Sequence, residues 1–214
     1  MADYRKPDTW ALKAQKEGYP ARSIYKLKEI AEKFHLFKSF KSFKPTAFGG
    51  ESVREKVLDL GAAPGSWSLY VLRNTASSLT AVDIAPLSRQ FDKGLFGDKE
   101  RFSFIQADIA DMETKALVKE RGPFALVLSD AAPATTGNRS IDTVRADVLA
   151  RTALEYAVDV LSKGGCFVVK VFQSGDSGEL LKEIKAIFEK GVGFKPKSCR
   201  SESFETYFVG IGKK

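Results

Sequence analysis

The spacing of hydrophobic positions in this 214-residue chain changes repeatedly from residue 56 onward. Short runs rich in β-branched and aromatic residues alternate with stretches whose apolar residues recur every three or four positions, as strands alternate with helices. The predicted strands are KVLDL, SLTAVDI, RFSFIQAD, FALVLSD, CFVVKVF and ETYFVGIG, and the predicted helices are SWSLYVLR, RADVLARTALEYAVDVL and SGELLKEIKAIFEKG. This order predicts an α/β fold with a mostly parallel, doubly wound sheet and an antiparallel C-terminal strand.

A further helical pattern lies before the first predicted strand. Ser23 is a candidate N-cap for a helix with one apolar face, which consists of Ile24, Leu27, Ile30, Ala31 and Phe34. The following FKSFKSFK, residues 37–44, repeats every three positions and predicts a helix end that runs into a loop. Its rings and lysines could stack on and neutralise RNA, or the rings could fold back on the domain with the lysines in solvent.

Positive charge is concentrated at the N-terminal end of the chain. The net charge is +7, and residues 1–44 hold eleven Lys and Arg against five Asp and Glu. The remaining residues are close to neutral. A basic segment ahead of a nearly neutral globule is typical of contact with a phosphate backbone, and a solvated helix face is the alternative.

Composition narrows the class of protein. The hydrophobic content is 43%, and the longest uncharged stretch, Gly61 to Leu72, is too short to span a bilayer. The N-terminal residues contain no apolar signal region, so we expect a cytoplasmic protein that does not bind membranes. The two cysteines, Cys166 in a predicted strand and Cys199 on a late one, have no metal-ligand spacing, and no metal site is expected.

The segment VLDLGAAPGSWS, residues 57–68, predicts a strand, a glycine-rich turn and a helix start. A dinucleotide site favours glycine at the first, third and sixth positions of that turn, where this chain has Gly61, Ala63 and Ser66. Acidic residues end the next three predicted strands, at Asp83, Asp108 and Asp130. Carboxylates at such positions can accept from ribose hydroxyls and an adenine amino group, so the pattern indicates an adenosine ligand.

Lys170 lies in the middle of the apolar strand GGCFVVKVFQ. On its face of the strand the neighbours are Val168 and Phe172, and burying an ammonium among them is costly unless it is paired or used. A lysine stem that reaches water at a strand end is the structural alternative.

Four ordered motifs together resemble the FtsJ-like ribosomal RNA large-subunit methyltransferases. They are ARSIYKL, GAAPGSWS, VVKVFQ and SFETYFVGIG, and the resemblance extends from about Tyr19 to the end of the chain. It implies a Rossmann-like methyltransferase fold, S-adenosyl-L-methionine as the methyl donor, and methylation of a ribose 2′-hydroxyl. We therefore expect residues 1–50 to form a basic, helical, RNA-binding segment packed on the same domain, and residues 51–214 to form the catalytic domain.

The resemblance also implies site residues. The catalytic set of the family falls on Lys26, Asp130, Lys170 and Glu205. Its cofactor contacts fall on Gly61, Gly65, Trp67, Asp83, Asp108 and Asp130.

Lys170 suits the role of base for the hydroxyl proton. Desolvation, a sulfonium nearby and a second ammonium at Lys26 favour its neutral form, whereas Asp130 and Glu205 favour the charged form and are better suited to orientation. Lys26 lies in the first turn of its predicted helix, where the helix dipole disfavours a cation, so a structural role alone does not explain it. Contact with a phosphate is an alternative role for Lys26.

Other methylation chemistries fit less well. Methylation of a base amino group calls for an aromatic platform after the fourth strand, where the sequence is DAAPAT. Methylation of pyrimidine carbon 5 needs a nucleophilic cysteine, and neither Cys166 nor Cys199 is suitably placed.

Two features depart from the usual pattern of the family. ARS stands where the order SRA is common, and PGSW replaces PGGW, as in tRNA-acting relatives. The loop from Phe37 to Glu55 is also longer than usual. We expect a monomer whose partner is ribosomal RNA or the large ribosomal subunit, with tRNA as the alternative substrate and a non-catalytic RNA-binding or assembly factor as the alternative function.

Overall fold

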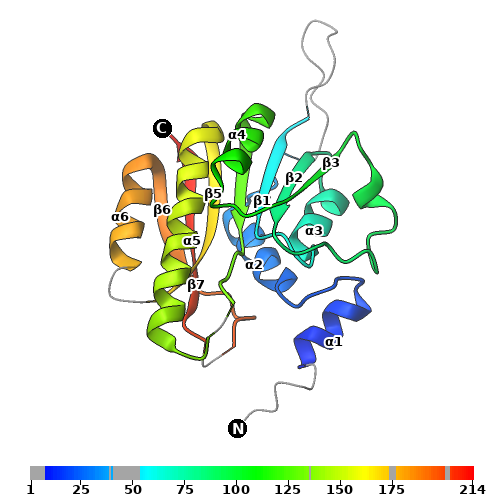
Figure 1. The fold of residues 1–214 in the computed structure, drawn as a ribbon, viewed down its shortest axis with the longest axis horizontal. Helices are drawn as coiled ribbons and strands as arrows, with labels where there is room; N and C mark the ends of the chain where they lie inside the picture. Colours follow the sequence, from blue (N-terminus) through cyan, green and yellow to red (C-terminus); the bar gives the residue numbers. More distant parts are fainter. Residues whose placement is uncertain (1–7, 39, 41–53, 135, 174–176, 201–202) are drawn as a thin grey trace, which may run out of the picture.

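A computed structural model describes residues 8–38, 40, 54–134, 136–173, 177–200 and 203–214 (Figure 1). One seven-stranded sheet forms its centre, with the strand order β3-β2-β1-β4-β5-β7-β6. The strands are β1 (Lys56–Leu60), β2 (Ser78–Asp83), β3 (Phe102–Gln106), β4 (Phe124–Ser129), β5 (Leu161–Phe172), β6 (Phe188–Phe194) and β7 (Glu205–Lys213).

The first five strands pair in parallel, and β7 is antiparallel to both of its neighbours, β5 and β6. The predicted fold class, a mostly parallel doubly wound sheet with an antiparallel C-terminal strand, is therefore confirmed. Strands β2 and β3 lie on one side of β1 in the sheet, and β4 and β5 lie on the other, so the strand order reverses between β1 and β4. Ligands bind at this point in such folds.

Helices cover both faces of the sheet (Figure 1). The helices are α1 (Thr9–Lys16), α2 (Ile24–Phe34), α3 (Ser66–Asn74), α4 (Met112–Arg121), α5 (Arg139–Val160) and α6 (Ser177–Ile187), and a short 3₁₀ helix spans Leu95–Gly97. One apolar core joins α1, α2 and α3 to the sheet, and a second joins α4, α5 and α6 to the opposite face. No helix in the described part of the chain is long and apolar enough to cross a membrane.

The N-terminal helices pack directly on this domain. The apolar face of α2 is buried as predicted, apart from Phe34, which is partly exposed and meets the ring of Phe194 edge-on. Phe37 and Phe40 are also buried, so these two rings of the FKSFKSFK repeat fold back on the domain. The rest of the repeat, Ser39 and residues 41–44, lies outside the described residues.

The C-terminal boundary of the last predicted helix was wrong. The segment SGELLKEIKAIFEKG is a helix only to Ile187, because β6 begins at Phe188. Two glycines make this strand possible: a Cβ on Gly191 would lie 2.8 Å from the Lys185 side chain, and one on Gly210 would lie 2.7 Å from Phe188. Close packing between chain segments, which the helical spacing of residues 177–191 does not reveal, therefore ends the helix.

Two helices were missed. Only Thr114 and Val118 of α4 are buried, so this helix shows little amphipathic pattern. Helix α1 begins at an N-cap, Asp8, whose carboxylate accepts from the Ala11 N–H at 2.9 Å. Both helices contribute few apolar positions, which is why the spacing of hydrophobic residues does not detect them.

Candidate functional site

A cavity of about 830 Å³ opens at the carboxyl ends of the parallel strands. The turn after β1, the ends of β2, β3 and β4, the side chain of Lys170 on β5, and the first half of α5 line it. Five of the predicted site residues are among the lining residues: Gly61, Asp83, Asp108, Asp130 and Lys170. Their location agrees with the general rule for ligands in parallel α/β sheets.

The turn after β1 depends on close backbone approach. Gly61 has a φ of 72°, and a Cβ at this position would lie 2.5 Å from the Cα of Ala131. Any larger residue would therefore push the turn away from the loop that follows β4. The absence of a side chain lets the two loops pack against each other at the edge of the cavity.

Asp83 fixes the same turn to the end of β2. Its carboxylate accepts hydrogen bonds from the Ala63 N–H and the Ala85 N–H, each at 2.8 Å. A carboxylate can accept about four hydrogen bonds, so Asp83 keeps capacity for the hydroxyls of a ribose. Asp108, at the end of β3, is exposed and accepts from the Ala110 N–H at 2.9 Å.

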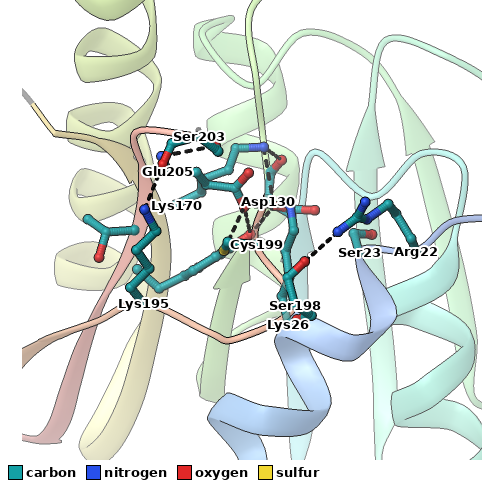
Figure 2. Close-up of polar contacts among 12 residues, drawn as sticks. Arg22, Ser23, Lys26, Asp130, Lys170, Lys195, Ser198, Cys199, Ser203 and Glu205 are labelled. Carbon is teal, nitrogen blue, oxygen red and sulfur yellow. Dashed lines mark hydrogen bonds and ion pairs between the residues drawn. The ribbon is translucent and has the colours of Figure 1, made fainter. Parts of the chain in front are cut away.

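Beside the cavity, a chain of contacts joins five side chains from four parts of the sequence, and Figure 2 shows Lys26, Asp130, Lys170 and Glu205 among them. The Lys170 Nζ lies 3.2 Å from Asp130 Oδ1 and also donates to the Asp130 carbonyl. The Tyr207 hydroxyl lies 2.7 Å from Asp130 Oδ1 and 2.6 Å from Glu205 Oε1. Glu205 Oε1 is in turn 2.5 Å from the Lys26 Nζ. We call these five residues the polar cluster.

The cluster residues are largely withdrawn from water, and the two carboxylates are matched by two ammonium groups. Burial by itself raises the pKa of Asp130, but Lys170 and Lys26 outweigh it and lower that pKa below its usual value. Burial lowers the pKa of Lys26, but Asp130 and Glu205 outweigh it and raise that pKa. Asp130 is therefore ionised and Lys26 charged at neutral pH, so Lys26 is unsuited to accept a proton.

Tyr207 is the member of the cluster that the sequence did not single out. Burial and the two neighbouring carboxylates raise its pKa well above the usual value, so its hydroxyl stays protonated. Glu205 and Tyr207 are two positions apart on β7 and therefore face the same side of the sheet. That spacing was the available signal, because a side chain on the face of a predicted catalytic residue is a candidate for the same site.

Helix α2 also holds the loop between β6 and β7 in place. The carboxylate of Glu29 accepts from the N–H groups of Lys197 and Ser198, at 2.6 and 2.9 Å. The Arg22 guanidinium donates to the Ser198 carbonyl, as Figure 2 shows, and to Asp8. These contacts bring the start of β7, and with it Glu205, beside Lys26.

Two residues expected to contact a cofactor do not line the cavity. Gly65 has a φ of 109° and faces Phe96, to which a Cβ would approach within 2.9 Å. Trp67 is buried, and its indole N–H donates to the Ser23 carbonyl at 2.9 Å. Both residues support the turn from the side away from the cavity. Their contact with a cofactor stays a prediction.

Ser23 differs from its predicted role. It precedes α2, but it has helical dihedral angles and its side chain makes no capping hydrogen bond. Instead, it lines the cavity. Ser23 is thus a lining residue that the sequence reasoning assigned to helix capping.

Cys199 lies in the loop between β6 and β7, not on a late strand as predicted. Its sulfur is 3.9 Å from Glu205 Oε1, and burial together with Glu205 raises the pKa of the thiol to about 11. Burial also raises the pKa of Cys166. Neither thiol is suited to nucleophilic attack, in line with the rejection of carbon-5 methylation.

The arrangement combines two capacities. Carboxylates on β2 and β3 offer acceptors to a nucleoside on one side of the cavity, while an amine on β5 faces the other side. Within the described ranges, no group of three or more His, Cys, Asp or Glu side chains could hold a metal ion. The geometry therefore suits proton removal from a substrate placed between Lys170 and a nucleoside-containing ligand.

Comparison with known proteins gives consistent matches. A family model described as FtsJ-like methyltransferase matches residues 19–213. Ribosomal RNA large subunit methyltransferase E of Treponema denticola is 47% identical over 210 residues, which cover 97% of this chain and 96% of that protein. The protein of the same name from Oleidesulfovibrio alaskensis is 39% identical and covers 100% of this chain and 94% of its own length.

Solved structures agree with the fold. A crystal structure described as a ribosomal RNA methyltransferase from Plasmodium falciparum superposes with a TM-score of 0.68 at 23% sequence identity. The match covers 91% of this chain and 98% of that one. At this identity the likeness concerns the arrangement of helices and strands.

Proposed function

Because the chain belongs to the FtsJ-like methyltransferase family, we propose that it methylates a ribose 2′-hydroxyl in large-subunit ribosomal RNA. The methyl donor is S-adenosylmethionine, which supplies a methyl group already made electrophilic by its sulfonium. The observation that carries the proposal is the position of Lys170, which lines the cavity with its amine held on Asp130.

The cavity fits an adenosine-containing donor. Gly61 lets the turn pack closely against the loop after β4, and Asp83 offers lone pairs to two ribose hydroxyls. Asp108, at the end of the adjacent strand, is positioned to accept from the adenine amino group. These residues bind and orient the donor, which is most of what the reaction requires, because transfer depends on alignment of the methyl group with the attacking oxygen.

Lys170 accepts the proton of the ribose hydroxyl at its Nζ. Asp130 orients this amine by accepting hydrogen bonds through its carboxylate and its carbonyl. Lys26 stays charged and is paired with Glu205, so it serves to hold the ribose or its phosphate and to balance the carboxylates. Tyr207 keeps the two carboxylates apart in fixed positions.

The proposal extends to the N-terminal part. Residues 1–50 act as an RNA-binding segment on the same domain as the catalytic residues 51–214, and the protein works as a cytoplasmic monomer. The packing of α1 and α2 supports this, since Lys13 and Lys28 lie over aromatic rings of the same two helices and their connection. Both lysines also pair with Glu17 and stay partly exposed, so a phosphate backbone can still reach them.

Transfer of labelled methyl groups to purified RNA tests the proposal. Large ribosomal subunits, free large-subunit RNA and tRNA, each from cells lacking this protein, are incubated with the purified chain, and 2′-O-methyl sites are mapped. We expect one ribose in large-subunit RNA to become modified. Modification of tRNA alone would replace the substrate, and methylation of a base would overturn the proposed chemistry.

A further inference from the structure

Ser66 connects the turn after β1 to the segment before α2. It is the first residue of α3 and is 1% exposed. Its Oγ accepts a hydrogen bond from the Ala21 N–H at 2.8 Å and donates one to the Ala21 carbonyl at 3.1 Å. One hydroxyl thus satisfies both backbone groups of a residue that is 45 positions away in the sequence.

The next residue makes a second connection. The Trp67 indole donates to the carbonyl of Ser23, which also accepts from the backbone N–H of Lys26 at 3.0 Å. The Trp67 ring packs against Tyr207, with ring centroids 5.9 Å apart. Helix α3 therefore contacts both the first turn of α2 and the strand that carries Glu205.

The start of α2 depends on these external contacts. Its N-cap, Ser23, makes no side-chain capping bond, so the helix does not fix its own first turn. Arg22 adds a contact to Asp8 and to the Ser198 carbonyl. Lys26 lies in this first turn, and its amine must reach Glu205 at 2.5 Å, a distance that a small rotation of the helix would lengthen.

Ser66 also follows directly after the turn that shapes the cavity. Gly61 of that turn lines the cavity, and Gly65 is the residue before Ser66. We propose that Ser66 is a positioning residue for Lys26. When the donor orders the turn after β1, Ser66 transmits this order to the first turn of α2. Trp67 acts in the same way through Ser23. The expected effect of Ser66 on methyl transfer rests on the proposed function.

A double-mutant cycle tests the inference in single-turnover methyl transfer with saturating RNA and donor. Ser66→Ala removes both hydrogen bonds, and we expect it to slow transfer roughly 10- to 100-fold while the donor binds nearly as well, because a misplaced group costs rate. In a Lys26→Ala background the same substitution should change the rate less than about twofold, since nothing remains to be positioned. Equal losses in both backgrounds would overturn the inference.

Two further variants separate positioning from folding. Trp67→Phe keeps the aromatic ring and removes only the N–H donor, and it should show the same dependence on Lys26. Ser162→Ala is the matched control, because it removes a hydroxyl that donates to the Phe124 carbonyl, on strands β4 and β5 away from α2. The control should not affect transfer in either background.

Hydrogen exchange tests the inference without RNA. With S-adenosylhomocysteine bound, the amides of residues 24–27 should gain protection in the wild type. In Ser66→Ala this gain should disappear while the gain at residues 61–65 persists. A gain of equal size at residues 24–27 in both proteins would contradict the connection, whereas failure of the wild type to methylate any RNA would contradict only the proposed function.

Discussion

The ends of β2 and β3 and the ends of β4 and β5 border the same cavity, but they hold charge in different ways. Asp83 and Asp108 are bonded to backbone N–H groups, and within the described residues neither forms an ion pair. Asp130, by contrast, has a side chain that is 15% exposed and lies in contact with Lys170. The first side offers acceptors to a ligand, while the second balances its own charges and presents one amine.

The difference reflects what each side has to do. Neutral hydroxyl and amino donors of a nucleoside need carboxylate acceptors. A carboxylate that stays partly hydrated can serve as such an acceptor without a cation beside it. Proton transfer needs an amine in a fixed position, and burying it without partners would be costly. Substitutions on the first side should therefore affect binding, and substitutions on the second side should affect rate.

The largest expected effect is on the side of the cavity that carries Lys170. Lys170→Ala should lower single-turnover methyl transfer by about 10² to 10⁴, the range of a positioned acid–base group, and leave donor binding unchanged. Lys170→Arg should not restore the rate, because a guanidinium does not give up its proton to become a base. Quench-flow measurement with labelled donor provides the rates. Near wild-type transfer by Lys170→Arg would show that Lys170 acts only as a cation.

A second prediction concerns Asp59, a buried carboxyl on β1, next to the side of the cavity whose carboxylates have no cation beside them among the described residues. Its Oδ2 accepts from the Ser68 hydroxyl at 2.6 Å, and burial raises its pKa from 3.8 to about 7. The folded state then holds a proton more tightly than the unfolded state between about pH 4 and 7. The free energy of unfolding contributed by this group should fall as the pH rises through that window.

Replacing this carboxyl by an amide removes that dependence. Asp59→Asn should be more stable than the wild type above pH 7, by at most on the order of 4 kcal/mol, and the difference should vanish near pH 4. Urea unfolding of both proteins across this range provides the measurement. Since Asp130 has a lowered pKa and contributes an opposite slope, only the difference between the two proteins is informative. A constant difference would contradict the assignment.

Donor binding should respond to the acceptor on β2. Asp83→Ala should weaken binding of S-adenosylmethionine roughly 10- to 100-fold, as expected for loss of a charge-assisted hydrogen bond. Asp98→Ala is a matched control, because Asp98 also accepts from two backbone N–H groups, those of Glu100 and Arg101. Calorimetry should give equal affinities for the control and the wild type. An Asp83→Ala protein with wild-type affinity would refute the role of this carboxylate.

The smallest effect concerns RNA and the basic N-terminal part. Replacing Lys38, Lys41 and Lys44 by glutamine should make the slope of log affinity against log salt shallower, by about 0.7 to 0.9 for each lost phosphate contact. Donor binding should not change. Filter binding at several salt concentrations gives the slope.

The control carries the same loss of charge elsewhere. Glutamine at Lys99, Lys119 and Lys163, which are exposed and lie after residue 50, should leave the slope as it is. Equal slopes for the two triple variants would show that RNA does not recognise the N-terminal segment.

The two sides of the cavity also differed in how well the sequence predicted them. Gly61, Asp83 and Asp108 follow strands with clear apolar patterns, so their common edge follows from the parallel order of the sheet. Lys26 and Glu205 lie at opposite ends of the chain, and only their resemblance to a family motif placed them with Lys170. Their actual contact depends on the packing of the β6–β7 loop against Glu29, which no local pattern encodes.

Contacts that depend on tertiary packing account for most of the errors. Ser23 has the residue type of an N-cap, but its side chain makes no capping bond and the residue lines the cavity, while Trp67 of α3 binds its carbonyl. Likewise, β6 has a helical spacing of apolar residues but pairs with β7 where Gly191 and Gly210 permit close approach. Local propensity yields in both places to packing between distant segments.

The location of β7 between β5 and β6 affects when the sheet can be completed during synthesis of the chain. A ribosome synthesises residues 205–213 after all other strands, and β6 pairs in the described sheet only with β7. Until then, β5 has an open edge, and a nascent chain lacks both Glu205 and Tyr207. If the proposed function holds, the strands that lead to Asp83 and Asp108 are made early in translation, whereas methyl transfer has to wait for the last strand to insert.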